Sequence, residues 1–182
     1  MLDNRLMKRS IGALMSGIAA LYVAHAQAAG YGIGAPVTGR ALSAWNIDVA
    51  PDGHGLPAGA GDVAHGKDVF AAKCAMCHGA AGQGGIGDRL VGGQGTLASD
   101  KPIKTIGSYW PYATTLFDYI RRAMPYNAPQ SLSADDVYAL SAYLLYLNGV
   151  VPDSTRLDAK TLPKVKMPNR DGFVPDPRPG TL

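Results

Sequence analysis

Cysteine is almost absent from this chain: only two of its 182 residues carry a thiol, and both lie in the stretch KCAMCHG. Two cysteines exclude a disulfide-rich scaffold, and they cannot supply the second CxxC knuckle of a common structural zinc site. Phenylalanine and tryptophan are also scarce, yet 47% of the residues are hydrophobic. A chain of this size and composition can bury one core, so we expect one domain with extensions.

Charge is sparse as well, and no basic run is present. Charged residues make up 17% of the chain, and the formal net charge is +3. A protein that binds nucleic acid through its phosphates needs clustered lysine and arginine. The sequence therefore argues against nucleic acid as a partner.

No apolar run is long enough to cross a bilayer. Three basic residues precede an apolar run at 11–23, which is shorter than the ~20 residues of a spanning helix. An A-x-A pattern then ends at Ala28. We expect residues 1–28 to be a cleaved signal peptide and the mature protein to be periplasmic without a membrane span. The alternative is an uncleaved N-terminal anchor.

The two thiols, Cys74 and Cys77, are followed directly by His78. A redox-active disulfide would need a βαβ context, and the sequence shows no convincing strands. Structural zinc would need four ligands, and the only other histidines of the mature chain are His54 and His65. C-x-x-C-H is the pattern of covalent haem attachment, in which the thiols form thioethers and the imidazole ligates iron. We predict one haem c on Cys74 and Cys77, with His78 as the proximal ligand.

A methionine is the usual second ligand in such electron carriers. Three of the six methionines lie in the signal segment, and Met76 lies inside the attachment loop, on the wrong side of the ring. Met124 ends a helical pattern and precedes a proline, which stiffens the turn that presents its thioether. We predict Met124 as the distal ligand, with Met167 and His65 as the alternatives.

Three helices are predicted around these residues, which makes the fold all-α. Asp62 caps the first, which runs on into CAMCH, and Gly66 inside it indicates a close helix crossing with Tyr143 or Tyr146. The second covers 114–123. The third begins at Ser133, ends at 148–149 and has a stripe of apolar residues, namely Val137, Leu140, Leu144 and Leu147.

Segments rich in glycine and proline flank a haem domain expected at 61–150. Residues 29–60 read as an N-terminal arm with one possible short helix at 40–45, lying on a partner or on the domain itself. The tail, 151–182, holds six prolines and should be extended. The glycine-rich loop 79–108 is expected to wrap a flat cofactor.

Four motifs in order, CAMCH, the G-x-x-x-F of Gly66 to Phe70, the RAMP of Arg122 to Pro125 and AYLLYLN, resemble a class I cytochrome c domain. The resemblance implies three main helices around one covalently bound haem, with the first and last helices crossing. It likewise implies His78 as the proximal and Met124 as the distal ligand.

Class I domains often have a proline whose carbonyl accepts a hydrogen bond from the proximal imidazole. Here the loop reads GDRLVGG. A backbone carbonyl near Arg89 or Leu90 is expected to serve instead, because the other ring nitrogen needs an acceptor.

A narrower resemblance extends to both arms. AWNIDVAPDGHGLP, GGQGTLASDKPIKTIGSYWPYATTLFDYIRRAMP and KMPNRDGF are similar to the cytochrome subunit that partners the molybdenum sulfite or sulfane dehydrogenase of bacterial sulfur oxidation. The resemblance implies that the chain is no enzyme by itself and passes electrons to another cytochrome c or an oxidase. Sulfane-type subunits often carry two haems, so the single CxxCH favours a single-haem version.

The sequence leaves two other functions open. One is a free periplasmic electron shuttle, for which the arm and tail would be unnecessary. The other is a haem sensor or peroxidase, which needs an open or bis-histidine iron site. Around the haem, Trp110 and Tyr112 could donate to the propionates or merely pack as rings. Four cations could offset the propionates, guide docking or lie on a solvated face, namely Lys101, Lys104, Arg121 and Arg122.

Overall fold

The structure, a computed structural model, describes residues 34–175, so the expected signal peptide lies outside the described residues. The chain divides into two compact units after Ser43. The described part of the first unit contains one short helix, α2 (Gly39–Ser43), in which no residue is buried. Its bounds are within two residues of those predicted for a short helix at 40–45. None of the helices within residues 34–175 combines the length and the apolar character needed to cross a bilayer.

The second unit contains the three predicted helices, and the first of them is divided in two at Cys74. Asp62 caps it by accepting a hydrogen bond from the backbone N–H of His65, and Ser133 caps the last helix through the N–H of Asp136. Cys74 has φ −124° and ψ −37°, which separates the long segment from a four-residue turn. The helices are α3 (Val63–Lys73), α4 (Ala75–His78), α5 (Ala113–Ala123) and α6 (Ala134–Leu147).

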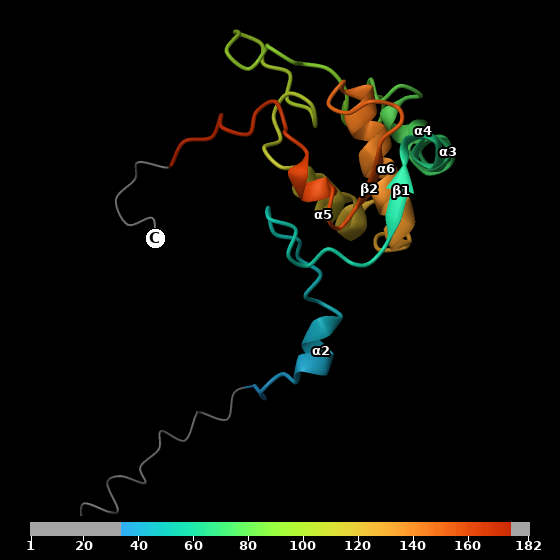
Figure 1. Cartoon of the computed structure of the whole chain (residues 1–182), viewed down its shortest axis with the longest axis vertical. Helices are drawn as coiled ribbons and strands as arrows, with labels where there is room; N and C mark the ends of the chain where they lie inside the picture. Colours follow the sequence, from blue (N-terminus) through green and yellow to red (C-terminus); the bar gives the residue numbers. More distant parts are fainter. Residues whose placement is uncertain (1–33, 176–182) are drawn as a thin grey trace, which may run out of the picture. The chain divides into compact units, whose positions relative to one another are not determined.

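Two short strands join the ends of the domain, and the sequence did not predict them. β1 (Ala60–Asp62) pairs antiparallel with β2 (Arg156–Asp158), with Gly61 opposite Leu157. Three-residue strands are too short to produce a readable alternation, so only the long-range pairing defines them. Figure 1 shows both strands beside α6, which they contact.

The C-terminal tail contributes to the core and is less extended than its prolines suggested. A 3-10 helix, η1 (Leu162–Lys164), follows β2. Leu157, Leu162 and Met167 of this segment are all buried in the hydrophobic core. The tail therefore closes the domain on the side of the first strand and of α5.

Helix α6 is the centre of the domain. Every residue from 137 to 145 is buried, which is wider than the predicted apolar stripe. The reason is that α3, α5 and both strands all pack against it. At the crossing with α3, Gly66 contacts Ala139 and Tyr143, whereas Tyr146 is 40% exposed. Of the two tyrosines expected at that crossing, Tyr143 occupies it.

Candidate functional site

The cysteines and the histidine of CAMCH lie on a single tight turn. The backbone N–H groups of Cys77 and His78 both donate to the carbonyl oxygen of Cys74, at 3.1 and 3.0 Å. Both cysteines are free thiols. The turn therefore presents two sulfurs and one imidazole from adjacent positions, as two thioether bonds and one iron ligand require.

The sulfur of Cys74 lies in a partly buried environment. Burial raises the pKa of the Cys74 thiol to about 11; Lys73 lowers it and Cys77 raises it further. Within residues 34–175, no three His, Cys, Asp or Glu side chains converge to hold a metal ion. A structural zinc site would need four such ligands.

The imidazole of His78 is oriented through its Nδ1 atom, which lies 2.7 Å from the carbonyl oxygen of Asp88. Because a carbonyl only accepts, Nδ1 carries the proton and Nε2 keeps its lone pair for a metal. The acceptor was expected near Arg89 or Leu90 and belongs to the residue just before them. Gly87 leaves room for the ring, since a Cβ there would lie 2.9 Å from Cε1 of His78.

The loop that follows the turn is held by Asn148, which sequence reasoning read only as the end of a helix. Its side chain accepts from Gly92 N–H at 3.1 Å and donates to the Leu90 carbonyl oxygen at 3.2 Å. Its own backbone carbonyl accepts from Gln94 at 3.0 Å. Asn148 thereby ties the glycine-rich loop to the end of α6. The partners are more than 50 residues away in sequence, so no local pattern could reveal them.

Met124 directly follows α5, where its N–H donates to the Ile120 carbonyl oxygen at 3.0 Å. Its side chain is partly buried against the same hydrophobic core as Cys74. The alternatives have other contacts: Met167 is a core residue with 3% exposure, and Nε2 of His65 lies 2.9 Å from the carboxylate of Asp136. These contacts favour Met124, whose role stays a prediction.

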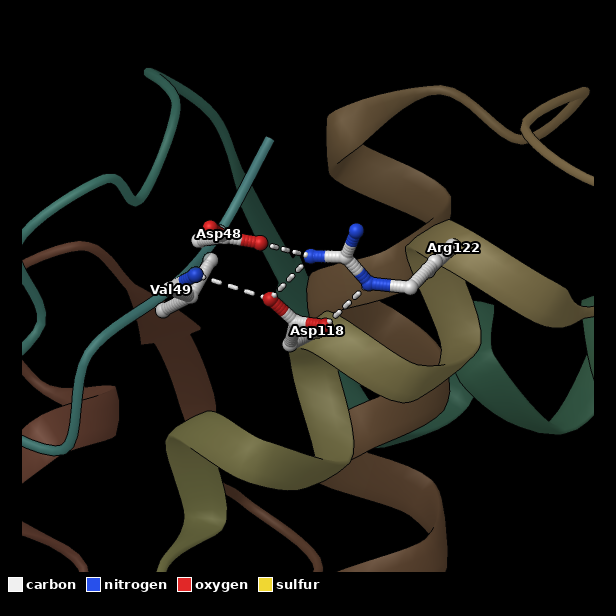
Figure 2. A network of polar contacts seen from close by, with 4 residues as sticks. All are labelled: Asp48, Val49, Asp118 and Arg122. Carbon is white, nitrogen blue, oxygen red and sulfur yellow. Dashed lines mark hydrogen bonds and ion pairs between the residues drawn. The ribbon is translucent and has the colours of Figure 1, made fainter. Parts of the chain in front are cut away.

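A polar network holds the last two turns of α5 (Figure 2). Asp118 accepts from the Val49 N–H at 2.8 Å and from Nε of Arg122 at 2.8 Å. Nη2 of Arg122 reaches Asp48 at 2.6 Å. Although burial acts in the opposite direction, these hydrogen bonds lower the pKa of the Asp118 carboxyl. Arg122, one of the four cations that could offset the propionates or guide docking, is thus engaged within the domain.

The two predicted propionate donors both make ring contacts at the start of α5. Trp110 lies edge-on to Tyr119, with centroids 5.6 Å apart. The guanidinium carbon of Arg170 lies 4.3 Å above the ring of Tyr112. Ring packing therefore occurs at both residues, and donation to a propionate stays a prediction.

The motif KMPNRDGF of the tail covers the loop that carries these aromatic residues. Asn169 Nδ2 donates to the Tyr109 carbonyl oxygen at 2.7 Å, and Phe173 packs edge-on against the ring of Tyr109 at 5.2 Å. The tail thus fixes the loop preceding α5.

Two free thiols on one turn, an imidazole with a free Nε2 and a partly buried thioether together fit a covalently attached haem.

Comparison with known proteins places the central part of the chain in a known family. A family model described as Cytochrome c matches residues 63–148. Two thiosulfate dehydrogenases are each 31% identical to the chain: that of Psychrobacter arcticus over 83 residues and that of Stutzerimonas stutzeri over 116 residues. The alignments cover 46% and 57% of this chain but 25% and 36% of those proteins, so the chain spans about a third or less of their length.

A solved structure matches far more of the chain. It is a chain of the sulfane dehydrogenase SoxCD from Paracoccus pantotrophus, with 47% identity and a TM-score of 0.76. The match covers 82% of this chain and 74% of that one. Because the predicted haem domain is only about half of the sequence, the similarity must extend into the flanking segments.

Proposed function

The chain belongs to the cytochrome c family, whose cofactor is covalently bound haem c, and we propose that it is the electron-accepting subunit of a molybdenum sulfite or sulfane dehydrogenase. In this proposal it is a periplasmic single-haem protein that carries one electron at a time and is no enzyme by itself. The observation that carries the proposal is the similarity to a SoxCD chain well beyond the haem domain.

Four residues are proposed to hold the cofactor. The sulfurs of Cys74 and Cys77 would form the thioethers, Nε2 of His78 would be the proximal ligand and the sulfur of Met124 would be the distal one. Bound haem supplies an iron that cycles between the ferrous and ferric states. As a ligand, Met124 would raise the reduction potential, because a thioether favours ferrous iron. Two protein ligands leave no open coordination position, which opposes the sensor or peroxidase alternative.

The proposed domain organisation keeps a signal peptide at 1–28, an arm at 29–60, a haem domain at 61–150 and a tail at 151–182. The arm has two different parts. From residue 44 on, it binds the haem domain through the Asp118 network and through Pro57, whose carbonyl oxygen accepts from Tyr138. The earlier part exposes apolar side chains, namely Val37 at 69% and Leu42 at 51%.

We propose that this earlier part of the arm binds the catalytic subunit of the dehydrogenase. Exposed apolar side chains on a short helix without a buried residue are typical of a surface that a partner covers. A freely diffusing shuttle would have no use for it. Deleting residues 29–43 should therefore weaken partner binding and leave the haem domain intact. Deleting as far as residue 58 would also remove Asp48 and Val49, which bind α5. A loss of partner binding could then not be told apart from a loss of stability of the haem domain.

The decisive experiment measures reduction of the purified ferric protein by sulfite, with and without a candidate molybdenum enzyme. We expect reduction only when the enzyme is present, and slower reduction of the 29–43 deletion at limiting enzyme concentration. Thiosulfate serves as the comparison substrate. Equal rates for the deletion variant and the full chain would support the free shuttle instead.

Covalent attachment is tested separately by denaturing mass spectrometry of the exported protein. We expect the mass of one haem on the wild-type chain, and none on a variant that carries both Cys74→Ala and Cys77→Ala. Wild-type polypeptide without added mass would rule out the cofactor assignment, whatever the electron donor.

A further inference from the structure

The N-terminal arm runs along one face of α5, in the opposite direction to the helix. Thr114, Asp118 and Arg122 are spaced by four residues and so lie on one face. In that order they contact Pro51, Val49 and Asp48: Oγ1 of Thr114 is 3.4 Å from the Pro51 carbonyl oxygen, and the other two contacts are those of the Asp118 network. Each turn of the helix therefore has one polar contact with the arm.

A different face of α5 is fixed by the core. Leu116, Phe117 and Ile120 are buried, with exposures of 2%, 0% and 6%. The helix is thus held on one face by apolar packing and on another by the arm. Arg122, whose contact with the arm is the last along the helix, lies in the final turn of α5. Met124 follows two residues later, so the arm restrains the helix next to the proposed ligand.

Asp118 is the centre of the arm contact. Its two carboxylate oxygens accept three hydrogen bonds, one from the arm backbone and two from Arg122. Figure 2 shows that Asp48 and Asp118 both point toward the same guanidinium group. Two carboxylates on one guanidinium fix its plane, since the planar fork bonds in defined directions. The side chain two residues before Met124 is therefore restrained from two segments that are 70 residues apart.

We propose that Asp118, Arg122 and Asp48 are positioning residues for the axial ligand Met124: the arm, bound to α5 through them, holds the end of the helix so that the thioether stays on the iron. The inference rests on the proposed ligation by Met124. The hydrogen bonds of the network join the three residues to one another and to Val49, so their effect is on how often Met124 leaves the iron and not on the chemistry of the bond.

Imidazole competition measures this directly. Added imidazole binds ferric iron only when the methionine is absent, so its apparent affinity reports the fraction of time that Met124 is dissociated. The holoprotein is titrated with imidazole while the methionine-to-iron charge-transfer band is followed. We expect Asp118→Ala, which removes three hydrogen bonds, to raise the apparent affinity about tenfold. Asp48→Asn removes only the charge of the exposed arm contact and leaves an oxygen that can still accept, so it should give a smaller change in the same direction.

Two variants calibrate the experiment. Thr115→Ala changes an exposed side chain of α5 that makes no hydrogen bond to the arm within residues 34–175, and it should leave the affinity unchanged. Met124→Ala should abolish the band and bind imidazole without competition. A purely structural network would lower the unfolding midpoint of Asp118→Ala and Asp48→Asn without changing imidazole affinity, and that result would overturn the inference. If Met124→Ala retains the band, the ligand assignment itself fails, and the inference fails with it.

Discussion

Gly66 of α3 and Ala139 of α6 touch backbone to backbone. A Cβ placed on Gly66 would overlap the carbonyl oxygen of Ala139 and lie 2.8 Å from Cβ of Tyr143. The same alanine is approached by Gly61 of β1, where a Cβ would lie 2.6 Å from that of Ala139. Two glycines thus allow α3 and the first strand to pack against a single turn of α6. The crossing sets the position of α3, and with it the position of the CAMCH turn that follows.

The Gly66→Ala substitution should therefore destabilise the domain. Alanine usually favours a helix by about 1 kcal/mol over glycine. Overpacking costs about 1–3 kcal/mol, and here the new methyl group meets backbone atoms, which places the cost in the upper part of that range. We therefore expect a net loss of up to about 2 kcal/mol. Chemical denaturation of the holoprotein measures it. Gly39→Ala is the matched control, because a Cβ at this helical glycine has open space. Equal stability of the Gly66→Ala variant and the wild type would mean that the crossing can widen at no cost.

The sequence predicted the parts of the fold that depend on local patterns. Asp62 and Ser133 were identified as caps because a cap and its partner N–H are three residues apart. The full burial of α6 was missed because it depends on strands of three residues each, whose pairing joins residues 60–62 to 156–158. Local periodicity cannot show which second or third element covers a helix.

The site, like the fold, has a part that a local motif predicts and a part that depends on distant contacts. CAMCH is a contiguous motif, and its chemistry follows from its residue types. The residues that orient the site were missed or misread, because their partners are distant: Asn148 binds Gly92 and Leu90, and Asp118 binds Val49 across 69 positions. Arg122 was weighed as a haem or docking cation, since its pairing with Asp48 depends on where the arm lies.

The start of α6 should be sensitive to acid through Asp136. Burial alone would raise its pKa, but hydrogen bonds with Ser133 and His65 lower the pKa below the ordinary value of 3.8. A carboxyl with a lowered folded pKa adds stability above its unfolded pKa and loses it as the pH falls through the folded value. Asp136→Asn should therefore be less stable than wild type at about pH 6 and converge toward it at about pH 2.

Urea unfolding at a series of pH values checks this convergence. Asp68→Asn is a suitable control, because Asp68 is an exposed carboxylate on α3 and the substitution changes the net charge by the same amount. A constant difference between Asp136→Asn and wild type across the pH range would contradict the prediction. It would show that the aspartate acts through packing or helix geometry and not through its charge.

The bond between His78 and Asp88 should influence the reduction potential. Donation from Nδ1 makes the imidazole a stronger ligand, which favours ferric iron. In Gly87→Ala, the new methyl group presses on Cε1 and Nδ1 of the ring at 2.9 and 3.0 Å and should weaken that bond. Loss of about 1 kcal/mol of ligand donation corresponds to a rise of about 40 mV for a one-electron couple. Spectroelectrochemical titration measures the shift, and Met76→Ala, at an 87% exposed position of the same motif, should not change it.

The last prediction separates the two roles considered for Tyr112. If its hydroxyl donates to a haem propionate, Tyr112→Phe leaves that negative charge less compensated; ferric iron is then favoured, and the potential falls. The stacked Arg170 should remain in place, because phenylalanine keeps the ring face. Tyr119→Phe is the control, since Tyr119 is 49% exposed and packs on Trp110. An unchanged potential in Tyr112→Phe, together with a loss of stability in Tyr112→Ala, would assign this tyrosine to ring packing alone.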